Sequence, residues 1–235
     1  MRTGSRDYIT KAVHRSLRNL QTDYIDLYQF HEPDPITPIE ETLRTLDDLV
    51  RAGTIRYYGV SKMPAWQVSR AYMTAKLLGI NEPVSCQDEY SLLQRSVVEP
   101  QLAPMMDAHG LGLLTYFPLA SGLLTGKYRA GETGGEAGRL RLQTPENARI
   151  AEMMTKRFDT GRNAALVEKL NTFAEARSHS LLELAFSWLL AQPCVTSVLA
   201  GATRPEQVRQ NAAAVDWTLT ADELRELDAL TLTPS

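Results

Sequence analysis

Cysteine is scarce in this sequence: Cys86 and Cys194 are the only two among 235 residues, and they lie far apart. Two distant cysteines exclude a disulfide framework and a zinc knuckle, so we expect no metal site. Long hydrophobic runs are also absent, because Glu183 and Ser187 interrupt the richest one at 181–190. The N-terminal residues lack the apolar stretch of a signal peptide, which predicts a cytoplasmic protein.

A large excess of charge of either sign is absent as well, since the formal net charge is -3 at pH 7. This balance gives no electrostatic reason to expect nucleic acid or a membrane as a partner. The 43% hydrophobic and 23% charged residues are ordinary for a globular protein. A chain of 235 residues is long enough to bury a sizeable core, so we interpret residues 1–235 as a single domain.

Strand and helix patterns alternate along the chain. Short apolar runs typical of buried parallel strands occupy 26–31, 55–61, 84–89, 113–117 and 197–201. Apolar residues at three- and four-residue spacing predict helices at 5–20, 37–52, 64–78, 98–108, 205–214 and 220–230, with two or more between 145 and 191. Capping residues are expected at three of these starts: Ser5 or Asp7, Thr37 with Glu40, and Thr220 with Glu223.

This alternation predicts right-handed βαβ units and a parallel sheet, either doubly wound or closed into a (β/α) barrel. No Gly-x-Gly-x-x-Gly follows a predicted strand, which counts against a dinucleotide-binding Rossmann unit. Polar or aromatic residues stand at the carboxyl ends of all five strands, and this favours the barrel. They are His31, Ser61 and Lys62, residues 87–89, Tyr116, and residues 201–203.

Three side chains have a plainer alternative to a functional role. His31 ends a strand before a proline-rich loop, where barrels carry their chemistry, but it also fits a histidine with its hydrogen bonds satisfied. Tyr116 could be a core aromatic residue, and Arg204 could be a solvated surface charge. The glycine-rich stretch 120–144 is interpreted as a long loop, and long loops are usually functional or disordered.

A series of motifs covering nearly the whole chain resembles the aldo-keto reductase family. Residues 16–31 resemble the segment around the active-site histidine of that family, and residues 59–61 resemble its Gly-Val-Ser turn. Residues 87–95 are similar to its Gln-x-x-Tyr segment. Residues 116–127 are similar to the long cofactor loop of relatives that include potassium-channel β subunits. Residues 201–211 resemble its phosphate and adenine site.

The resemblance implies an α/β fold of the (β/α)8 TIM-barrel type and an NADPH-dependent oxidoreductase that reduces aldehydes or ketones to alcohols. It implies that His31 orients and polarises the substrate carbonyl as a catalytic residue. It also implies the contacts to NADPH. These are Ser61 and Gln87 at the nicotinamide carboxamide, Tyr116 on its ring, Leu119, Ser121 and Lys127 along the pyrophosphate and ribose, Gly201, Thr203, Gln207 and Asn211 at the adenosine, and Arg204 at the 2′-phosphate.

The sequence departs from the family in its first part. The catalytic aspartate, tyrosine and lysine of the family precede the histidine, and only His31 of the four is matched here. About five of eight barrel strands are predicted, so strands 26–31 and 197–201 would be left as edges. We therefore expect an omitted N-terminal part, a shortened relative, or two copies that complement each other as a homo-oligomer. Lys62 replaces a common asparagine, and Phe117 replaces a common serine.

Three functions remain open at this point. The first is NADPH-dependent reduction of a small-molecule carbonyl compound. The second is an NADPH-binding sensor or regulatory subunit without turnover. The third is an inactive, truncated relative. The substrate cannot be read from the sequence, because specificity in such barrels lies in their loops.

Overall fold

The computed structural model describes residues 3–126 and 161–232. These residues form two compact units. Unit 1 comprises Met1–Asp88 and Ser96–Leu114, and unit 2 comprises Glu89–Arg95 and Thr115–Ser235. The single domain expected over residues 1–235 stays a prediction. Most of the expected loop at 120–144 lies outside the described residues.

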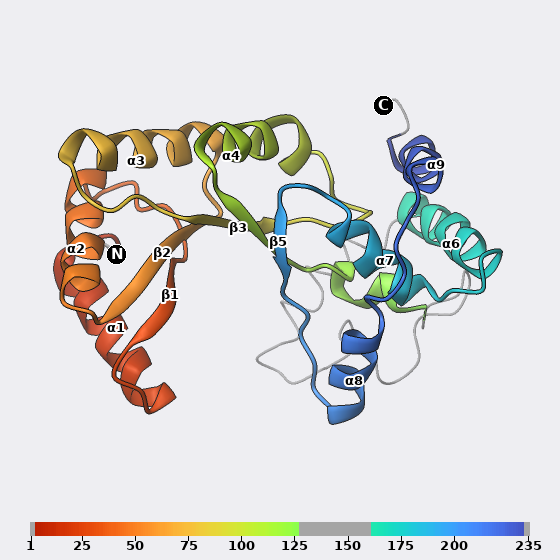
Figure 1. The fold of residues 1–235 in the computed structure, drawn as a ribbon, viewed down its shortest axis with the longest axis horizontal. Coiled ribbons are helices and arrows are strands. Elements are labelled where there is room, and N and C mark those ends of the chain that lie inside the picture. Colours follow the sequence, from red (N-terminus) through yellow and green to blue (C-terminus); the bar gives the residue numbers. More distant parts are fainter. Residues whose placement is uncertain (1–2, 127–160, 233–235) are drawn as a thin grey trace. The chain divides into compact units, whose positions relative to one another are not determined.

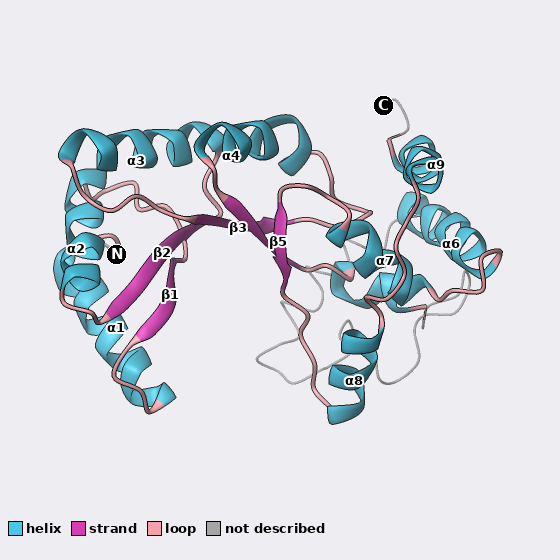
Figure 2. Cartoon of the chain, in the orientation of Figure 1, coloured by secondary structure: helices cyan, strands magenta, loops and turns pink. Residues whose placement is uncertain are grey.

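Five strands alternate with helices and follow one another in a single sheet in the order β1-β2-β3-β4-β5 (Figure 2). The strands are β1 (Ile25–Phe30), β2 (Ile55–Ser61), β3 (Ser85–Glu89), β4 (Gly112–Tyr116) and β5 (Val195–Val198). The pairings of β1 with β2 and of β2 with β3 are parallel. The predicted α/β class is therefore confirmed. Among the described residues β1 and β5 stand at the two ends of the sheet, as predicted.

The last strand lies earlier in the chain than predicted. Strand β5 ends at Val198, whereas the apolar pattern predicted a strand to Gly201. The backbone N–H of Leu199 still donates to the oxygen of Thr115 on β4, at 3.0 Å. Thr203 then bonds forward to Gln207. These hydrogen bonds place Thr203 at the start of the next helix, so the strand does not continue toward it.

Helices cover one side of the strands in unit 1. They are α1 (Arg6–Leu20), α2 (Ile39–Arg51), α3 (Ala65–Leu78) and α4 (Ala103–His109), the last preceded by the π-helical turn η1 (Val98–Leu102). Helix α2 packs against β2, with α1 and α3 as its neighbours (Figure 1). The apolar residues of these helices that face the sheet are buried, among them Val13, Leu46 and Ala71. This burial stabilises unit 1 and orders the strand ends.

Two predicted side-chain caps do not form. At α1, Ser5 holds the N-cap position without a capping hydrogen bond, so the cap expected from Ser5 or Asp7 is wrong. Helix α2 begins at Ile39 after Pro38, and no side chain caps it. The hydroxyl of Thr37 donates instead to Asp34 Oδ2 at 2.7 Å. The capping box expected from Thr37 and Glu40 therefore does not form, because an acceptor in the preceding loop competes for the threonine.

Unit 2 is mainly helical. In its described residues the helices are the 3-10 segment η2 (Ala120–Thr125), α6 (Gly161–Glu175), α7 (Leu181–Leu190), α8 (Pro205–Ala213) and α9 (Ala221–Thr231). Helix α7 is the most deeply buried, with Leu184 and Trp188 fully inaccessible to solvent. Helix α6 packs against both α7 and α9. The capping box predicted from Thr220 and Glu223 is confirmed at the start of α9.

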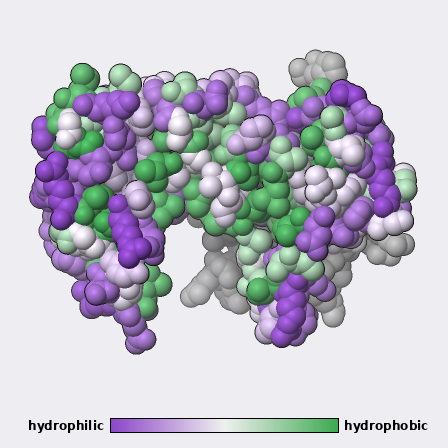
Figure 3. Space-filling model, viewed as in Figure 1, coloured by the Kyte–Doolittle hydropathy of each residue, from purple (hydrophilic) through white to green (hydrophobic). Residues whose placement is uncertain are grey.

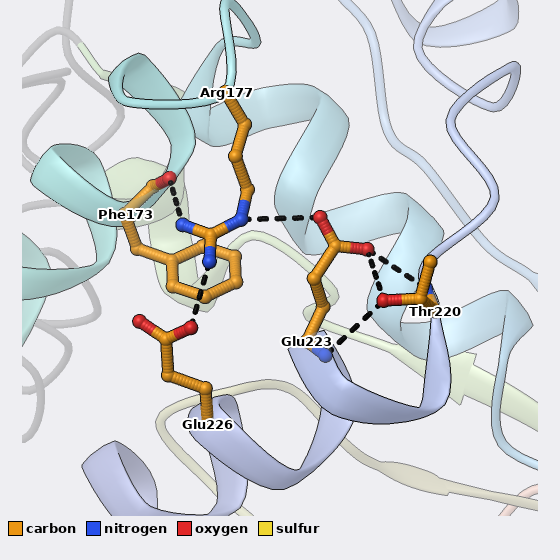
Figure 4. A network of polar contacts seen from close by, with 5 residues as sticks. All are labelled: Phe173, Arg177, Thr220, Glu223 and Glu226. Atoms are coloured by element: carbon orange, nitrogen blue, oxygen red, sulfur yellow. Dashed lines mark hydrogen bonds and ion pairs between the residues drawn. The ribbon is translucent and has the colours of Figure 1, made fainter.

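Arg177 joins the end of α6 to α9 (Figure 4). Its guanidinium donates to Glu223 Oε1 at 3.1 Å, to Glu226 Oε2 at 2.7 Å and to the backbone oxygen of Phe173 at 3.0 Å. It also lies 3.7 Å from the centre of the Phe173 ring, a cation–π geometry. Several polar partners thus hold a helix whose only buried side chain is Leu227.

Candidate functional site

Ser61 and Gln87 lie side by side on neighbouring strands in unit 1, with Ser61 at the carboxyl end of β2 and Gln87 two residues before the end of β3. They are paired in the β2–β3 register, and the backbone N–H of Lys62 donates to the Gln87 oxygen at 3.1 Å. Ser61 is buried and Gln87 is half-buried. His31 follows β1, whose residue Phe30 pairs with Val60, so it stands beside Ser61 in the continued register. His31, Ser61 and Gln87 are called the strand-end set below.

The imidazole of His31 is exposed, and no hydrogen bond is made to it among the described residues. Its surroundings are nevertheless fixed by an ion pair between Lys62 Nζ and Glu32 Oε1 at 2.7 Å. The hydrogen bond and the charge of Lys62 hold the pKa of Glu32 below its ordinary value. This pair joins the residue after His31 to the residue after Ser61.

Lys62 has a left-handed backbone, with φ at 55°. Asparagine adopts this conformation more readily than lysine does. The asparagine that the sequence resemblance led us to expect here would therefore relieve backbone strain. With lysine at position 62 the backbone strain remains, but the side chain forms the ion pair with Glu32.

Asp34 anchors the loop that follows His31. Its Oδ2 accepts from the backbone of Gly4 and from the Thr37 hydroxyl, both at 2.7 Å, and its Oδ1 accepts from the backbone of Ile36 at 2.8 Å. Partial burial tends to raise the pKa of this carboxyl, but the hydrogen bonds outweigh it and lower the pKa to about 2. The loop is thus tied to the start of the described chain.

Cys86 is adjacent to Gln87 in sequence but is not a candidate nucleophile. It is buried at 3% exposure. Burial, together with the charge of Asp88, raises the pKa of its thiol to about 12. A thiol with such a pKa stays protonated and unreactive near neutral pH.

In unit 2, Tyr116 ends β4 and is half-buried. Its ring meets the ring of Phe117 edge-on, with centroids 5.4 Å apart. The chain then turns sharply: Phe117, Ala120 and Ser121 all have positive φ, at 51°, 44° and 58°. The predicted residues Leu119 and Ser121 lie in this turn, half-buried and buried respectively. Lys127 lies outside the described residues.

The remaining predicted residues surround the start of α8. The backbone N–H and the hydroxyl of Thr203 both donate to Gln207 Oε1, at 2.7 and 3.1 Å. Asn211 follows one turn after Gln207, so the two share a helix face. Arg204 is the N-cap residue and is exposed. Thr203, Arg204, Gln207 and Asn211 are called the helix-start set below, and Gly201 lies exposed just before them.

The surface of α8 is mostly hydrophilic (Figure 3), in keeping with a helix that has no buried residue. Pro205 at the first position of α8 supplies no backbone N–H, so the start of this helix offers one donor fewer to an anion. The cation of Arg204 is therefore the main attraction for a phosphate in this set.

Sequence reasoning missed one polar pair close to the strand-end set. Gln29 Nε2 donates to Ser85 Oγ at 3.0 Å, across the intervening strand β2. Each of these residues precedes a predicted site residue, His31 or Gln87, by two positions. The alternation of side chains along a strand would have pointed to both.

A comparison with family models matches residues 1–231 to the aldo/keto reductase family. The chain belongs to this family. Two similar curated proteins are called "Probable voltage-gated potassium channel subunit beta", one from Oryza sativa subsp. japonica and one from Arabidopsis thaliana. Each is 36% identical over 212 residues, covering 90% of this chain and 62% of that protein.

A third relative is the "Putative voltage-gated potassium channel subunit beta" of Schizosaccharomyces pombe. It is 32% identical over 228 residues, which cover 96% of this chain and 64% of that protein. The chain therefore spans less than two thirds of the length of these relatives. Membership of the aldo/keto reductase family confirms the predicted resemblance and barrel-type fold. No described helix has the length and apolar character needed to cross a bilayer.

The donors and acceptors of the strand-end set fit the cofactor expected for this family. A nicotinamide carboxamide presents one carbonyl acceptor and one NH2 donor. The hydroxyl of Ser61 and the side-chain amide of Gln87, adjacent in register, offer both complementary functions. The residues present therefore suit the carboxamide end of a nicotinamide cofactor.

Proposed function

We propose that this chain binds NADP(H) and acts as an oxidoreductase on small aldehydes or ketones. The observation that carries the proposal is the pairing of Ser61, at the end of β2, with Gln87 on β3. Two complementary hydrogen-bonding groups on rigid strands orient a carboxamide better than the same groups on loops would. The bound cofactor would supply the hydride, and the protein would supply position and polarity.

His31 would act on the substrate. Its exposed ring can donate an N–H to a carbonyl oxygen, which polarises the carbon toward hydride attack. The Lys62–Glu32 ion pair would keep the strand ends beside it in place. Neither the substrate nor the residue that delivers the proton is assigned.

Tyr116 and the helix-start set would bind the rest of the cofactor. Tyr116 ends a strand and has a planar face on which a nicotinamide ring can stack. Arg204 would bind the 2′-phosphate that distinguishes NADPH from NADH. The Thr203–Gln207 hydrogen bonds would order the backbone that meets the adenosine.

The test is NADPH binding by the purified 235-residue chain, read as quenching of Trp and Tyr fluorescence, followed by carbonyl-dependent NADPH oxidation. Gln87→Leu should weaken binding about tenfold, because the carboxamide would lose the hydrogen bond that Gln87 makes to it. Gln101→Leu is the matched control, since Gln101 is an exposed glutamine on η1. Absence of saturable NADPH binding by the unsubstituted chain would refute the proposal.

A separate substitution tests the stacking role. Tyr116→Ala should weaken NADPH binding by about 1 kcal/mol or more, judged from aromatic pairs. An unchanged dissociation constant would remove Tyr116 from the site.

The second candidate function is NADP(H) binding without turnover, as a sensor or regulatory subunit. The names of the three relatives, all potassium channel β subunits, favour it. Saturable NADPH binding with no oxidation across a panel of aldehydes and ketones would support this candidate over the reductase. A small-molecule carbonyl partner, a cytoplasmic location and a homo-oligomer stay predictions.

A further inference from the structure

A second polar layer lies directly beneath the strand-end set in unit 1. Along a strand, alternate residues face the same side. Gly59 and Ser61 therefore share one face of β2, and Ser85 and Gln87 share one face of β3. The two layers are separated by about 6.6 Å along the strands. The lower layer is bridged by the hydrogen bond from Gln29 Nε2 to Ser85 Oγ, at 3.0 Å.

This bridge passes over Gly59 and depends on the missing side chain there. Gln29 is paired with Gly59 in the β1–β2 register. A Cβ at position 59 would lie 2.2 Å from Ser85 Oγ and 2.6 Å from Gln29 Oε1, closer than any real contact. Glycine thus lets one side chain of β1 reach a side chain of β3 across a whole strand.

The bridge is not an efficient way to stabilise a fold. Within the described residues, Gln29 Oε1 is buried and accepts no hydrogen bond. Reversing the amide would leave Nε2 unpaired instead. An unpaired buried polar atom costs free energy, and apolar side chains would avoid that cost. Features that break a stability rule in this way concentrate at functional sites.

A comparison of the β1–β2 and β2–β3 pairings shows which strand the Gln29–Ser85 bridge restrains. The β1–β2 register contains five residue pairs, whereas the β2–β3 register contains two, Val60 with Cys86 and Ser61 with Gln87. Strand β3 thus has fewer register pairs with β2 than β2 has with β1, although backbone hydrogen bonds from Val84 to Tyr58 and from Lys62 to Gln87 flank those two pairs. A tie from β1 to Ser85 restrains β3 just two residues before Gln87.

We propose that Gln29 is a positioning residue: by holding Ser85, it fixes the place of Gln87 relative to Ser61. The latter two residues form the carboxamide-binding pair of the proposed function, and the purpose of the bridge rests on that function. Gln29 itself touches neither cofactor nor substrate in this role.

The experiment is a double-mutant cycle with Gln29→Leu, Ser85→Ala and the two combined. Each single variant should weaken NADPH binding about threefold or more, the size of one lost hydrogen bond. The double variant should be no weaker than the worse single variant, because both remove the same bridge. Binding of adenosine 2′,5′-bisphosphate, which lacks the nicotinamide, should not change. The free energy of unfolding should change little for Gln29→Leu, which removes one unpaired buried atom, Gln29 Oε1, and leaves another, Ser85 Oγ.

The side-chain amide NMR signal of Gln87 in the ligand-free variants provides an independent readout. It should move in both single variants, and a signal that stays in place overturns the positioning role whatever the binding result. Additive losses in the cycle, or equal losses for NADPH and adenosine 2′,5′-bisphosphate, also overturn it. If the unsubstituted chain fails to bind NADPH while the Gln87 signal moves as expected, the proposed function falls and the positioning of Gln87 stands.

Discussion

The strand-end set and the helix-start set are held in place by different interactions. Ser61 is 2% exposed and belongs to a paired strand. Helix α8 has no buried residue, and Thr203, Arg204 and Asn211 lie at or near its exposed surface. The strand layer around Ser61 is thus part of the core, whereas the helix-start set is held by local hydrogen bonds. Changes to buried residues of that layer should affect folding, and changes in the helix-start set should affect binding alone.

The helices of the two units differ in a related way. None of α1, α2, α3 or α4 in unit 1 has a side-chain cap, and they gain their stability by burial against the sheet. In unit 2, α7 and α9 each begin with a complete capping box. Helix α9 buries only Leu227, so capping and the Arg177 ion pairs replace burial. Local polar contacts matter most where the buried area is small.

The largest effect is expected in the strand layer. Gly59→Ala should lower the free energy of unfolding by about 2 kcal/mol, because its Cβ would displace the side chains of Ser85 and Gln29 and leave their buried polar atoms unpaired. Urea denaturation measures this. Gly161→Ala is the matched control: a Cβ added there would meet no atom within 4 Å, and the variant should be neutral or slightly stabilising. Equal behaviour of the two variants would contradict the tight packing at Gly59.

A smaller effect, of a different kind, is expected in the helix-start set. Arg204→Ala should weaken NADPH binding about tenfold, or about 1.4 kcal/mol, and spare NADH, because only NADPH carries the 2′-phosphate. The free energy of unfolding should not change. Arg209→Ala, on the same helix and paired with Glu206, is the control. Equal losses for both nucleotides would end the role of Arg204 as a 2′-phosphate ligand.

Removing a capping side chain should destabilise a helix of unit 2. Thr220→Ala should lower the free energy of unfolding by about 1 kcal/mol, because the backbone N–H of Glu223 loses its acceptor. Thr218→Ala, two residues before the cap and exposed, should cost much less. Thermal or urea unfolding of both variants measures this, and an equal or larger loss for Thr218→Ala would contradict the capping role of Thr220.

The smallest effect concerns pH. The folded-state pKa of Asp34, about 2, lies below its ordinary value of 3.8, so the folded chain holds the proton less tightly than the unfolded chain does. Its stabilising effect is therefore complete above about pH 5 and lost as the pH falls toward 2. We expect a loss below about 1 kcal/mol, because the carboxylate is partly exposed. Asp34→Asn should flatten the profile over this range in acid titrations followed by urea denaturation, and an unchanged slope would count against the anchor.

Much of the fold was predictable because its signals are local. Apolar periodicity located β2 at Ile55–Ser61 as observed, and α3 and α9 to within one residue. The helix predicted at 98–108 is present but begins as a π-helical turn. Pro100 lies inside that turn, and its missing N–H is one reason the regular helix begins only after it.

The prediction errors arise where a hydrogen bond depends on a competing partner or on one far away in the sequence. Thr37 was expected to cap α2, but Asp34 takes its hydroxyl. The capping box of Ser180 and Glu183 has the same spacing as the box predicted at Thr220, and a systematic search for that spacing would have found it. The Gln29–Ser85 bridge joins residues 56 positions apart, so no local pattern contains it.

The same contrast between local sequence signals and distant partners applies to the site residues. The motif resemblance supplied the residue types of the strand-end set, and the structure adds that Ser61 and Gln87 are neighbours. It also adds that Gln207 is joined to Thr203, which the sequence order alone does not require. Roles for these residues stay predictions until binding is measured.

The turn after Tyr116 has a consequence for the entropy change on ligand binding. Ala120 and Ser121 hold left-handed conformations that glycine would adopt without strain. Residues with a side chain have a far narrower left-handed basin than glycine does, so this turn has little freedom left to lose. A ligand held by Leu119 and Ser121 would meet a segment that is already ordered. Calorimetry should then show a smaller entropic penalty for the parent chain than for a variant with glycine at both positions.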